Sequence, residues 1–113
     1  MDDAKSVNFA EFTIKQTVRF QNNLQKILFY TLEEWGGKVM AEFYCEVVKQ
    51  IELLKFFPKI NSKNRFLGST EIKEYRNIIL KNYPYVITYS IQGNFIRIIN
   101  ITHKKQNPAS RRI

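Results

Sequence analysis

Hydrophobic positions recur with two different periods along this chain, and the change of period separates the expected elements. From residue 17 to residue 56, apolar residues return every three or four positions, which is the period of an α-helix. From residue 74 to residue 103 they form runs of β-branched and aromatic residues, which are typical of strands. A short alternating segment, residues 9–15, precedes the helical part. The pattern predicts the element order β-α-α-β-β-β.

Two helices are expected, over residues 17–35 and 38–56. Gly36 and Gly37 lie between them and can end a helix, because glycine readily adopts a positive φ. Pro58 marks the end of the second helix. The two together form an antiparallel helical hairpin. Its expected apolar faces carry Phe20, Leu24, Ile27, Leu28 and Trp35 in the first helix and Met40, Phe43, Tyr44, Val47, Val48, Ile51 and Leu54 in the second.

Three strands are expected after the helices, over residues 74–81, 85–91 and 95–103. Pro84 has no N–H to donate and therefore belongs in a connection, and Gly93 favours a tight hairpin turn. The strands form an antiparallel meander. The face predicted to meet the core carries Tyr85, Ile87, Tyr89 and Ile91. The fold class predicted is α+β, an antiparallel sheet with the helical hairpin packed on one face.

The length of 113 residues fits one domain, residues 1–113, and we expect flexible termini at 1–7 and 104–113. A polar, cationic loop is expected over residues 59–70. Cys45 is the only cysteine, so no internal disulfide can form. No apolar run approaches the ~20 residues of a membrane span, and the first residues lack a signal-peptide pattern. These features together predict a soluble, cytoplasmic protein.

Positive charge is concentrated in the second half of the chain. Residues 1–74 hold 11 basic and 10 acidic groups, whereas residues 75–113 hold seven basic groups and no acidic one. The sheet and the tail therefore carry +7 of the net +8. Charge separated in this way creates a field that can select an anionic partner.

Metal-dependent catalysis is disfavoured by the residues present. The only aspartates are Asp2 and Asp3, and the single histidine and single cysteine are far apart in sequence. No zinc-ligand spacing and no glycine-rich phosphate loop occur. We therefore expect neither a metal nor another cofactor.

Arg76 lies on the first strand of the meander, on the same face as Ile78 and Leu80. A guanidinium there could grip a phosphate or a carboxylate. The alternative is an internal ion pair with a glutamate such as Glu71 or Glu52. The sequence leaves both interpretations open.

His103 ends the last strand, next to Lys104 and Lys105. A neutral imidazole at this position could act as a general base. The simpler interpretation is a strand-end histidine that makes one hydrogen bond and has no chemical role. Among the neighbouring tyrosines, Tyr83 lies in a turn and is the freest to contact a partner, whereas Tyr85 and Tyr89 are expected in the core.

Several short patterns, taken in order, resemble the RelE/ParE superfamily of toxins from type II toxin–antitoxin systems. The resemblance runs from about Phe9 to Pro108. The residues that carry it are Trp35-Gly36 with Ala41, Leu54 with Phe57-Pro58, Leu67-Gly68, Tyr75-Arg76, residues 85–91, and residues 98–101 leading into His103.

The resemblance implies one of two activities. One branch of the superfamily cuts mRNA on the ribosome without a metal, through attack of the ribose 2′-hydroxyl on the adjacent phosphate. Members of the other branch, the ParE-like toxins, inhibit DNA gyrase by binding. In both branches a cognate antitoxin neutralises the toxin, and operator DNA is bound only through the toxin–antitoxin complex.

The end of the chain favours the ParE-like branch. Nuclease members often carry a tyrosine after the terminal histidine, whereas here Lys104 follows His103 and no tyrosine occurs after Tyr89. The resemblance then implies a surface for gyrase or antitoxin formed by Arg76, Lys81, Tyr83, Arg97, Lys104, Lys105, Arg111 and Arg112. In the nuclease alternative, Arg76 would hold the phosphate and His103 would be the base or acid. A third hypothesis, a small basic nucleic-acid-binding module, ranks last because the cations are not interleaved with evidently exposed aromatic residues.

Overall fold

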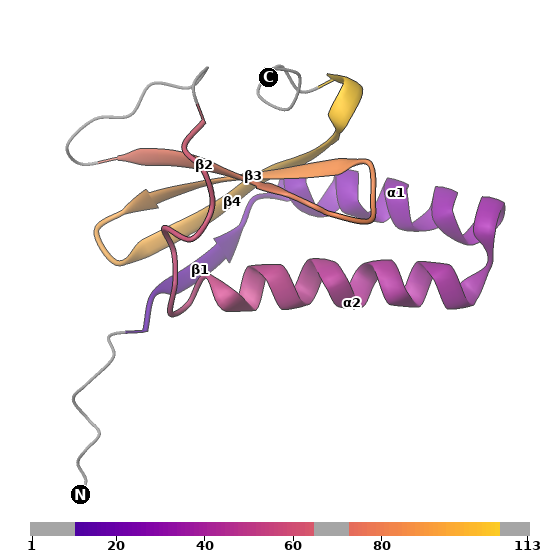
Figure 1. Ribbon diagram of the computed structural model, residues 1–113, viewed down its shortest axis with the longest axis horizontal. Coiled ribbons are helices and arrows are strands. Elements are labelled where there is room, and N and C mark those ends of the chain that lie inside the picture. Colours follow the sequence, from indigo (N-terminus) through magenta and orange to yellow (C-terminus); the bar gives the residue numbers. More distant parts are fainter. Residues whose placement is uncertain (1–10, 65–72, 107–113) are drawn as a thin grey trace, which may run out of the picture.

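The element order agrees with the prediction. The computed structural model of the chain describes residues 11–64 and 73–106. Within them, two long helices follow a short strand, and three strands and a 3₁₀ turn complete the fold (Figure 1). The elements are β1 (Thr13–Gln16), α1 (Val18–Trp35), α2 (Gly37–Leu53), β2 (Glu74–Ile79), β3 (Tyr85–Gln92), β4 (Phe95–His103) and the 3₁₀ helix Lys104–Gln106.

The four strands form one sheet in the order β1-β4-β3-β2. The meander β2-β3-β4 is antiparallel throughout, as predicted. β1 differs, because it pairs with β4 in parallel, with Ile14 opposite Ile96. Between β1 and β4 the chain passes through both helices and two strands, and it returns to the sheet in the direction in which it left. The sheet is therefore mixed, and only its three-stranded part is antiparallel.

Glycine closes both tight connections. Gly36 has φ of 91° and donates its N–H to the carbonyl of Leu32 at 3.0 Å, while its own carbonyl accepts from Met40 at 3.1 Å. One residue therefore ends α1 and begins α2, which holds the helices side by side (Figure 1). Gly93 has φ of 62° in the two-residue turn between β3 and β4. α2 ends at Leu53, three residues before the predicted end, where residues 54–56 form a turn that leads to Pro58.

The first strand is shorter than predicted and decides where α1 lies. Residues 11 and 12 are not in a strand, and residues 9 and 10 lie outside the described part. Since β1 stops at Gln16, the edge of β4 beyond Ile98 is open, and the start of α1 occupies it. Thr17 caps the helix by accepting from the N–H of Phe20 at 3.0 Å, and its hydroxyl donates to the carbonyl of Ile99 at 2.8 Å. The strand is shortened at its N-terminal end, and its C-terminal end at Gln16 determines where α1 begins.

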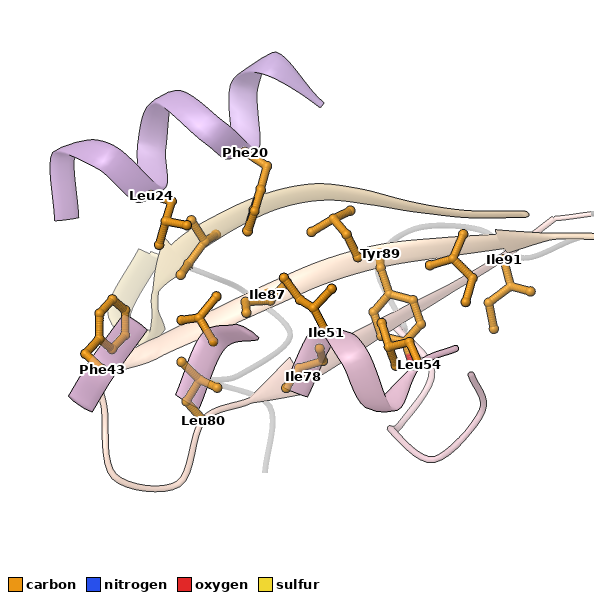
Figure 2. Packing of buried hydrophobic residues seen from close by; sticks show 14 residues of the cluster. Phe20, Leu24, Phe43, Ile51, Leu54, Ile78, Leu80, Ile87, Tyr89 and Ile91 are labelled. Atoms are coloured by element: carbon orange, nitrogen blue, oxygen red, sulfur yellow. The ribbon is translucent and has the colours of Figure 1, made fainter. Parts of the chain in front are cut away.

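The core lies between the helical hairpin and one face of the sheet. Figure 2 shows Phe20 and Leu24 pointing from α1 toward the strands, and Phe43 and Ile51 of α2 reaching the same cluster. β2 and β3 contribute alternate residues, whereas a bulge in the pairing of β3 with β4 separates Ile98 from Ile101 by three positions. The strand residues of this core cluster are Ile78, Ile87, Tyr89, Ile91, Ile96, Ile98 and Ile101, with Leu80 just after β2. Tyr85, predicted on this face, packs at its margin and is half-buried.

Three residues of the predicted helical faces are exposed instead. Trp35, Tyr44 and Val48 were expected in the core, and the exposed fraction of Trp35 reaches 66%. Each helix turns by about 100° per residue, so that a residue 15 positions after Phe20 is rotated by about 60° from it. Tyr44 and Val48 each follow a fully buried neighbour and are rotated one step away from the sheet. The buried face of each helix is therefore narrower than the set of apolar residues in the sequence suggests.

The opposite face of the sheet carries buried polar groups. Asn77 is buried on β2, and its side-chain oxygen accepts from Asn64 and from the Thr88 hydroxyl, each at 3.0 Å. Lys63 forms an isolated bridge with Arg76, and the carbonyl of Tyr75 accepts from the N–H of Asn64 at 2.8 Å. The first part of the predicted 59–70 loop is thus paired with the edge of β2. Residues 65–70 lie outside the described part.

The tail that was expected to be flexible begins with a short regular element. Residues 104–106 form a 3₁₀ turn, and the N–H of Lys104 donates to the carbonyl of Pro84 at 2.8 Å. The end of β4 is thereby tied to the turn between β2 and β3. Residues 1–7 and 107–113 are outside the described part. Neither helix of the described chain combines the length and the hydropathy that a membrane crossing would need.

Candidate functional site

Arg76 is held by groups of its own chain. Its guanidinium donates to the Glu74 carboxylate, with Nε 2.5 Å from Oε2, and forms an ion pair with the same group. It also donates to the carbonyl oxygens of Asn61 and, at 3.4 Å, Lys59. Only 12% of its side chain is exposed. We refer to Arg76, Glu74, Lys59 and Asn61 as the Arg76 cluster.

The Arg76 cluster answers the question that the sequence left open. The guanidinium forms an internal ion pair, but the partner is Glu74 and neither glutamate that was suggested. Glu52 pairs with Lys55 at 3.0 Å, and Glu71 lies outside the described residues. Glu74 and Arg76 are two positions apart on one strand, so their side chains share a face. Carboxylate and carbonyl oxygens already occupy the guanidinium donors that a phosphate would need.

Tyr89 connects the Arg76 cluster to the core. Its ring is fully buried, and its hydroxyl donates to the carbonyl of Pro58 at 2.6 Å and accepts from Asn61 at 3.3 Å. Burial raises the pKa of this phenol, because the charged form would lose its hydration. The two hydrogen bonds of Tyr89 therefore hold the loop whose carbonyl groups accept from Arg76.

His103 lies at the other end of the sheet, at the end of β4. Its Nδ1 accepts the N–H of Lys105 at 3.0 Å, and its ring meets the edge of Tyr85 with centroids 5.6 Å apart. In a neutral imidazole whose Nδ1 is an acceptor, the hydrogen sits on Nε2. The lone pair that could accept a proton is then on Nδ1, and it already accepts the N–H of Lys105. In this geometry His103 offers a hydrogen-bond donor rather than a base.

The structure does not bring Arg76 and His103 together. Arg76 pairs with Tyr89 on β3, and His103 pairs with Tyr85, four residues along the same strand. Four residues span about 13 Å along a strand and two strand spacings add about 10 Å, which places the two backbones roughly 16 Å apart. A base and a phosphate-binding cation for one reaction must act within a few ångströms of the same phosphate.

The other predicted binding residues that the structure describes lie in two places. Lys81, Tyr83, Lys104 and Lys105 gather at one end of the sheet, where the turn after β2 meets the end of β4. Arg97 lies near the opposite end of β4, opposite Lys15 of β1. Arg111 and Arg112 lie outside the described residues. The resemblance implied a surface formed from these residues, and their described members lie at separate places on the sheet.

An open cleft of about 710 Å³ adjoins the group at the end of the sheet. Its floor is aromatic: Phe43 contacts Tyr83 at 5.0 Å and Tyr85 at 5.5 Å between ring centroids. We call this feature the aromatic cleft. Its lining residues are Asn23, Lys26, Ile27, Tyr30, Thr31 and Trp35 from α1, Val39 and Phe43 from α2, residues 82–85 from the turn, and Ile101, Thr102, His103 and Gln106 from the end of the chain.

The chemistry of the aromatic cleft is one-sided. It has hydrogen-bond donors and a cation, Lys26, but no carboxylate among its lining residues. Burial raises the pKa of Tyr85 and of Tyr83, and Glu42 and Glu46 near Tyr83 raise the latter further. Both phenols therefore keep their hydrogens as donors well above neutral pH. Such a cleft suits a ligand with a flat apolar body and acceptor groups.

Sequence reasoning missed the wall of the cleft that α1 provides. Lys26 was passed over, Tyr30 was not assigned to a face, and Trp35 was placed in the core. Tyr30 lies three positions after Ile27, which is a local signal that the two share a side of the helix. That this side faces the turn 82–85, more than 50 residues away, is a tertiary fact that no local pattern contains.

A second apolar groove, of about 690 Å³, crosses the outer side of the helical hairpin. It is lined by Asn22, Gln25, Lys26, Leu28, Phe29, Leu32 and Met40. Across residues 11–64 and 73–106, no three histidine, cysteine, aspartate or glutamate side chains gather closely enough to hold a metal ion. Cys45 is exposed and has no disulfide partner.

Comparison with known proteins places this fold among the toxins of type II toxin–antitoxin systems. A family model described as the ParE toxin of the type II toxin–antitoxin system, parDE, matches residues 14–108. That match covers most of the chain, and the chain therefore belongs to the ParE toxin family.

A solved structure agrees with this fold. A chain from the structure titled "Chromosomal ParDE TA system from P. aeruginosa" superimposes with a TM-score of 0.62 and 18% sequence identity. The alignment covers 83% of this chain and 97% of that one. A search of curated proteins finds no match. At this identity the likeness establishes the fold, and the family model carries the assignment.

Proposed function

We propose that this protein is a ParE-like toxin that acts in the cytoplasm, inhibits DNA gyrase by binding to it, and is neutralised by a cognate antitoxin. The observation that carries the proposal is the match of the ParE toxin family model to residues 14–108. The sequence favours the same branch, because Lys104 follows His103 where nuclease members often have a tyrosine.

The geometry supports binding over RNA cleavage. A metal-free nuclease needs a base for the 2′-hydroxyl and cations on the phosphate, all within reach of one nucleotide. Here Arg76 is engaged by Glu74, and His103 uses Nδ1 to accept from Lys105. The two residues also lie at different ends of the sheet. A protein that inhibits an enzyme by binding to its surface does not need a free Arg76 and His103 at one site.

Charge supports an acidic antitoxin. Residues 75–113 carry seven basic groups and no acidic one, so this half of the molecule attracts an anionic segment and speeds the encounter with it. Neutralising that charge would also remove the repulsion between toxin copies. Operator DNA would then be bound through the antitoxin complex and not by the toxin alone.

The test is a supercoiling assay with purified gyrase, relaxed plasmid and ATP. We expect the toxin to inhibit supercoiling and to increase gyrase-linked DNA breaks, and we expect prior addition of its antitoxin to abolish both effects. A parallel reaction contains ribosomes that translate a defined message. Cleavage of that message with gyrase unaffected would overturn the proposal in favour of the endoribonuclease alternative.

The two activities also differ in the variants that abolish them. An endoribonuclease would lose cleavage on Arg76→Ala or His103→Ala while binding its ribosomal target. A gyrase inhibitor should keep its activity in His103→Gln, because the glutamine side chain also offers both a hydrogen-bond donor and an acceptor at that site. Lys49→Ala, on the exposed side of α2, serves as the control that should behave as wild type in both assays.

A further inference from the structure

The aromatic cleft combines exposed aromatic rings on one wall with a floor of packed aromatic rings. Tyr30 and Trp35 on its α1 wall are 54% and 66% exposed, although both are large aromatic residues. The opposite side is the packed array of Phe43, Tyr83 and Tyr85. Among the described residues, no ring pair includes Tyr30 or Trp35, whereas the floor is held by the contacts of Phe43 with Tyr83 and Tyr85.

The polar groups of the cleft include one cation and several hydrogen-bond donors, but no carboxylate. Lys26 brings an ammonium group, and Asn82 and Gln106 bring amides. His103 accepts at Nδ1 from the backbone of Lys105, which assigns the N–H of the neutral ring to Nε2. Lys81 and Lys105 adjoin lining residues in sequence and are exposed. The amide groups can donate or accept, whereas Lys26 favours a ligand that supplies an acceptor with negative charge.

We propose that the aromatic cleft binds a nucleotide, with the base against the exposed aromatic rings and the phosphate near Lys26. Every nucleobase has a flat face that stacks on tyrosine and tryptophan, and this contact depends little on sequence. The phosphate supplies the negative charge that the donor-rich rim lacks. The volume of about 710 Å³ lies within the range of small-molecule sites. This inference does not depend on gyrase inhibition.

The structure supports the hypothesis of nucleic-acid binding more strongly than the sequence did. That hypothesis ranked last because no exposed aromatic residues were evident beside the cations. In the folded chain, Tyr30 and Trp35 are exposed and share one cleft with Lys26. The nucleotide can be free or can be an unpaired position of a single strand, and both present the same base and phosphate.

Trp35 provides the measurement, because it is the only tryptophan of the chain and lines the cleft. Its fluorescence, excited at the red edge of the indole band, is titrated with AMP, adenosine and inorganic phosphate. We expect saturable quenching by AMP and binding at least about tenfold weaker for adenosine and for phosphate, because each lacks one of the two contacts. A ten-residue single-stranded DNA and duplex DNA of the same length distinguish an unpaired strand from a free nucleotide.

Two variants and two matched controls locate the site. Lys26→Ala and Tyr30→Ala should each weaken AMP binding by about tenfold, because one removes the charge and the other a stacking surface. Lys49→Ala and Tyr44→Ala remove an exposed lysine and an exposed tyrosine of α2 that do not line the cleft, and they should bind AMP as wild type does. Circular dichroism verifies that all four variants fold.

Three results would overturn the proposal. The first is absence of saturable quenching by AMP, with equilibrium dialysis against labelled AMP also negative. The second is equal weakening by the cleft variants and the control variants, which would place binding elsewhere. The third is binding of AMP that is no tighter than inorganic phosphate alone, which would show simple charge attraction. Tighter binding of the single strand than of AMP would support the site and identify the strand as its source.

Discussion

The Arg76 cluster and the aromatic cleft are both polar sites beside one sheet, but they differ in how far their own chain satisfies them. In the Arg76 cluster a guanidinium meets a carboxylate and two carbonyl groups, and 12% of its side chain is exposed. In the aromatic cleft, Lys26 and Trp35 are exposed and no carboxylate lines the walls. We expect the first arrangement to stabilise the fold, whereas the second leaves a cation and an aromatic ring exposed. A basic residue in a sequence therefore indicates a partner only after its internal partners are known.

The largest expected effect comes from the residue that joins the cleft to the core. Phe43 is 1% exposed and supports both Tyr83 and Tyr85. Phe43→Ala should lower the free energy of unfolding by about 3–5 kcal/mol through lost burial and a residual cavity. Urea denaturation followed by circular dichroism measures this. Phe29→Ala, at an exposed position of α1, is the control and should change stability by less than about 0.5 kcal/mol. Similar small losses for both would mean that the cleft floor is not part of the core.

Removal of Arg76 tests whether its cluster is structural. Arg76→Ala leaves Glu74 without its main partner and frees two carbonyl groups, so stability should fall by about 1–3 kcal/mol. The double variant Arg76→Ala/Glu74→Ala should cost less than the sum of the two single changes, because the carboxylate is no longer left unpaired. The proposed gyrase inhibition should persist in the folded variant. Unchanged stability with lost inhibition would instead place Arg76 on a binding surface. Arg19→Ala, which removes an exposed arginine of α1, is the control.

The hydrophobic pattern predicted the helices and strands well, because the side chains on one buried face recur every three to four residues in a helix and every two in a strand. Both helices and the three-stranded meander followed from it. The pairing of Glu74 with Arg76 was also available, since opposite charges two positions apart on a strand share a face. The ion pair was not predicted, because the glutamates suggested as partners of Arg76 were Glu71 and Glu52, which are farther away in the sequence.

What the sequence did not contain is how separate elements meet. The parallel pairing of β1 with β4 joins segments about 80 residues apart, and nothing within four residues of β1 specifies its partner. The aromatic cleft likewise exists only because α1 brings Lys26 and Tyr30 next to the turn before β3. Trp35 was assigned to the core since it continued a stripe that, over 15 residues, had already rotated away from the sheet.

Alkaline pH should weaken the part of the fold that holds the Arg76 cluster. The pKa of Tyr89 is raised in the folded state by burial, so the folded protein keeps this proton at a pH where the unfolded chain has lost it. The contribution is fully present below the unfolded pKa of about 10 and is lost as the pH rises through the folded pKa. Urea midpoints should therefore fall from about pH 10 upward.

Tyr89→Phe separates this effect from other titrations at high pH. It removes the hydrogen bond to the Pro58 carbonyl and should cost about 1 kcal/mol near neutral pH. Its stability should then decline less steeply than that of wild type above about pH 10. Tyr44→Phe, at an exposed position, should reproduce the wild-type slope. Parallel curves for wild type and Tyr89→Phe would show that Tyr89 does not control the alkaline transition.

The smallest effect on stability is expected where charge serves a partner. Lys81→Ala/Lys105→Ala removes two exposed cations beside the aromatic cleft and should change stability by less than about 0.5 kcal/mol. The association rate with an acidic antitoxin, measured by stopped flow at low salt, should nevertheless fall several-fold, and the difference should shrink as salt screens the field over about 10 Å. Lys38→Ala/Lys49→Ala removes the same charge from α2, where Glu42 and Glu46 already offset it, and should slow association less. Equal slowing by the two double variants would mean that net charge, and not its concentration at one end of the sheet, governs the encounter.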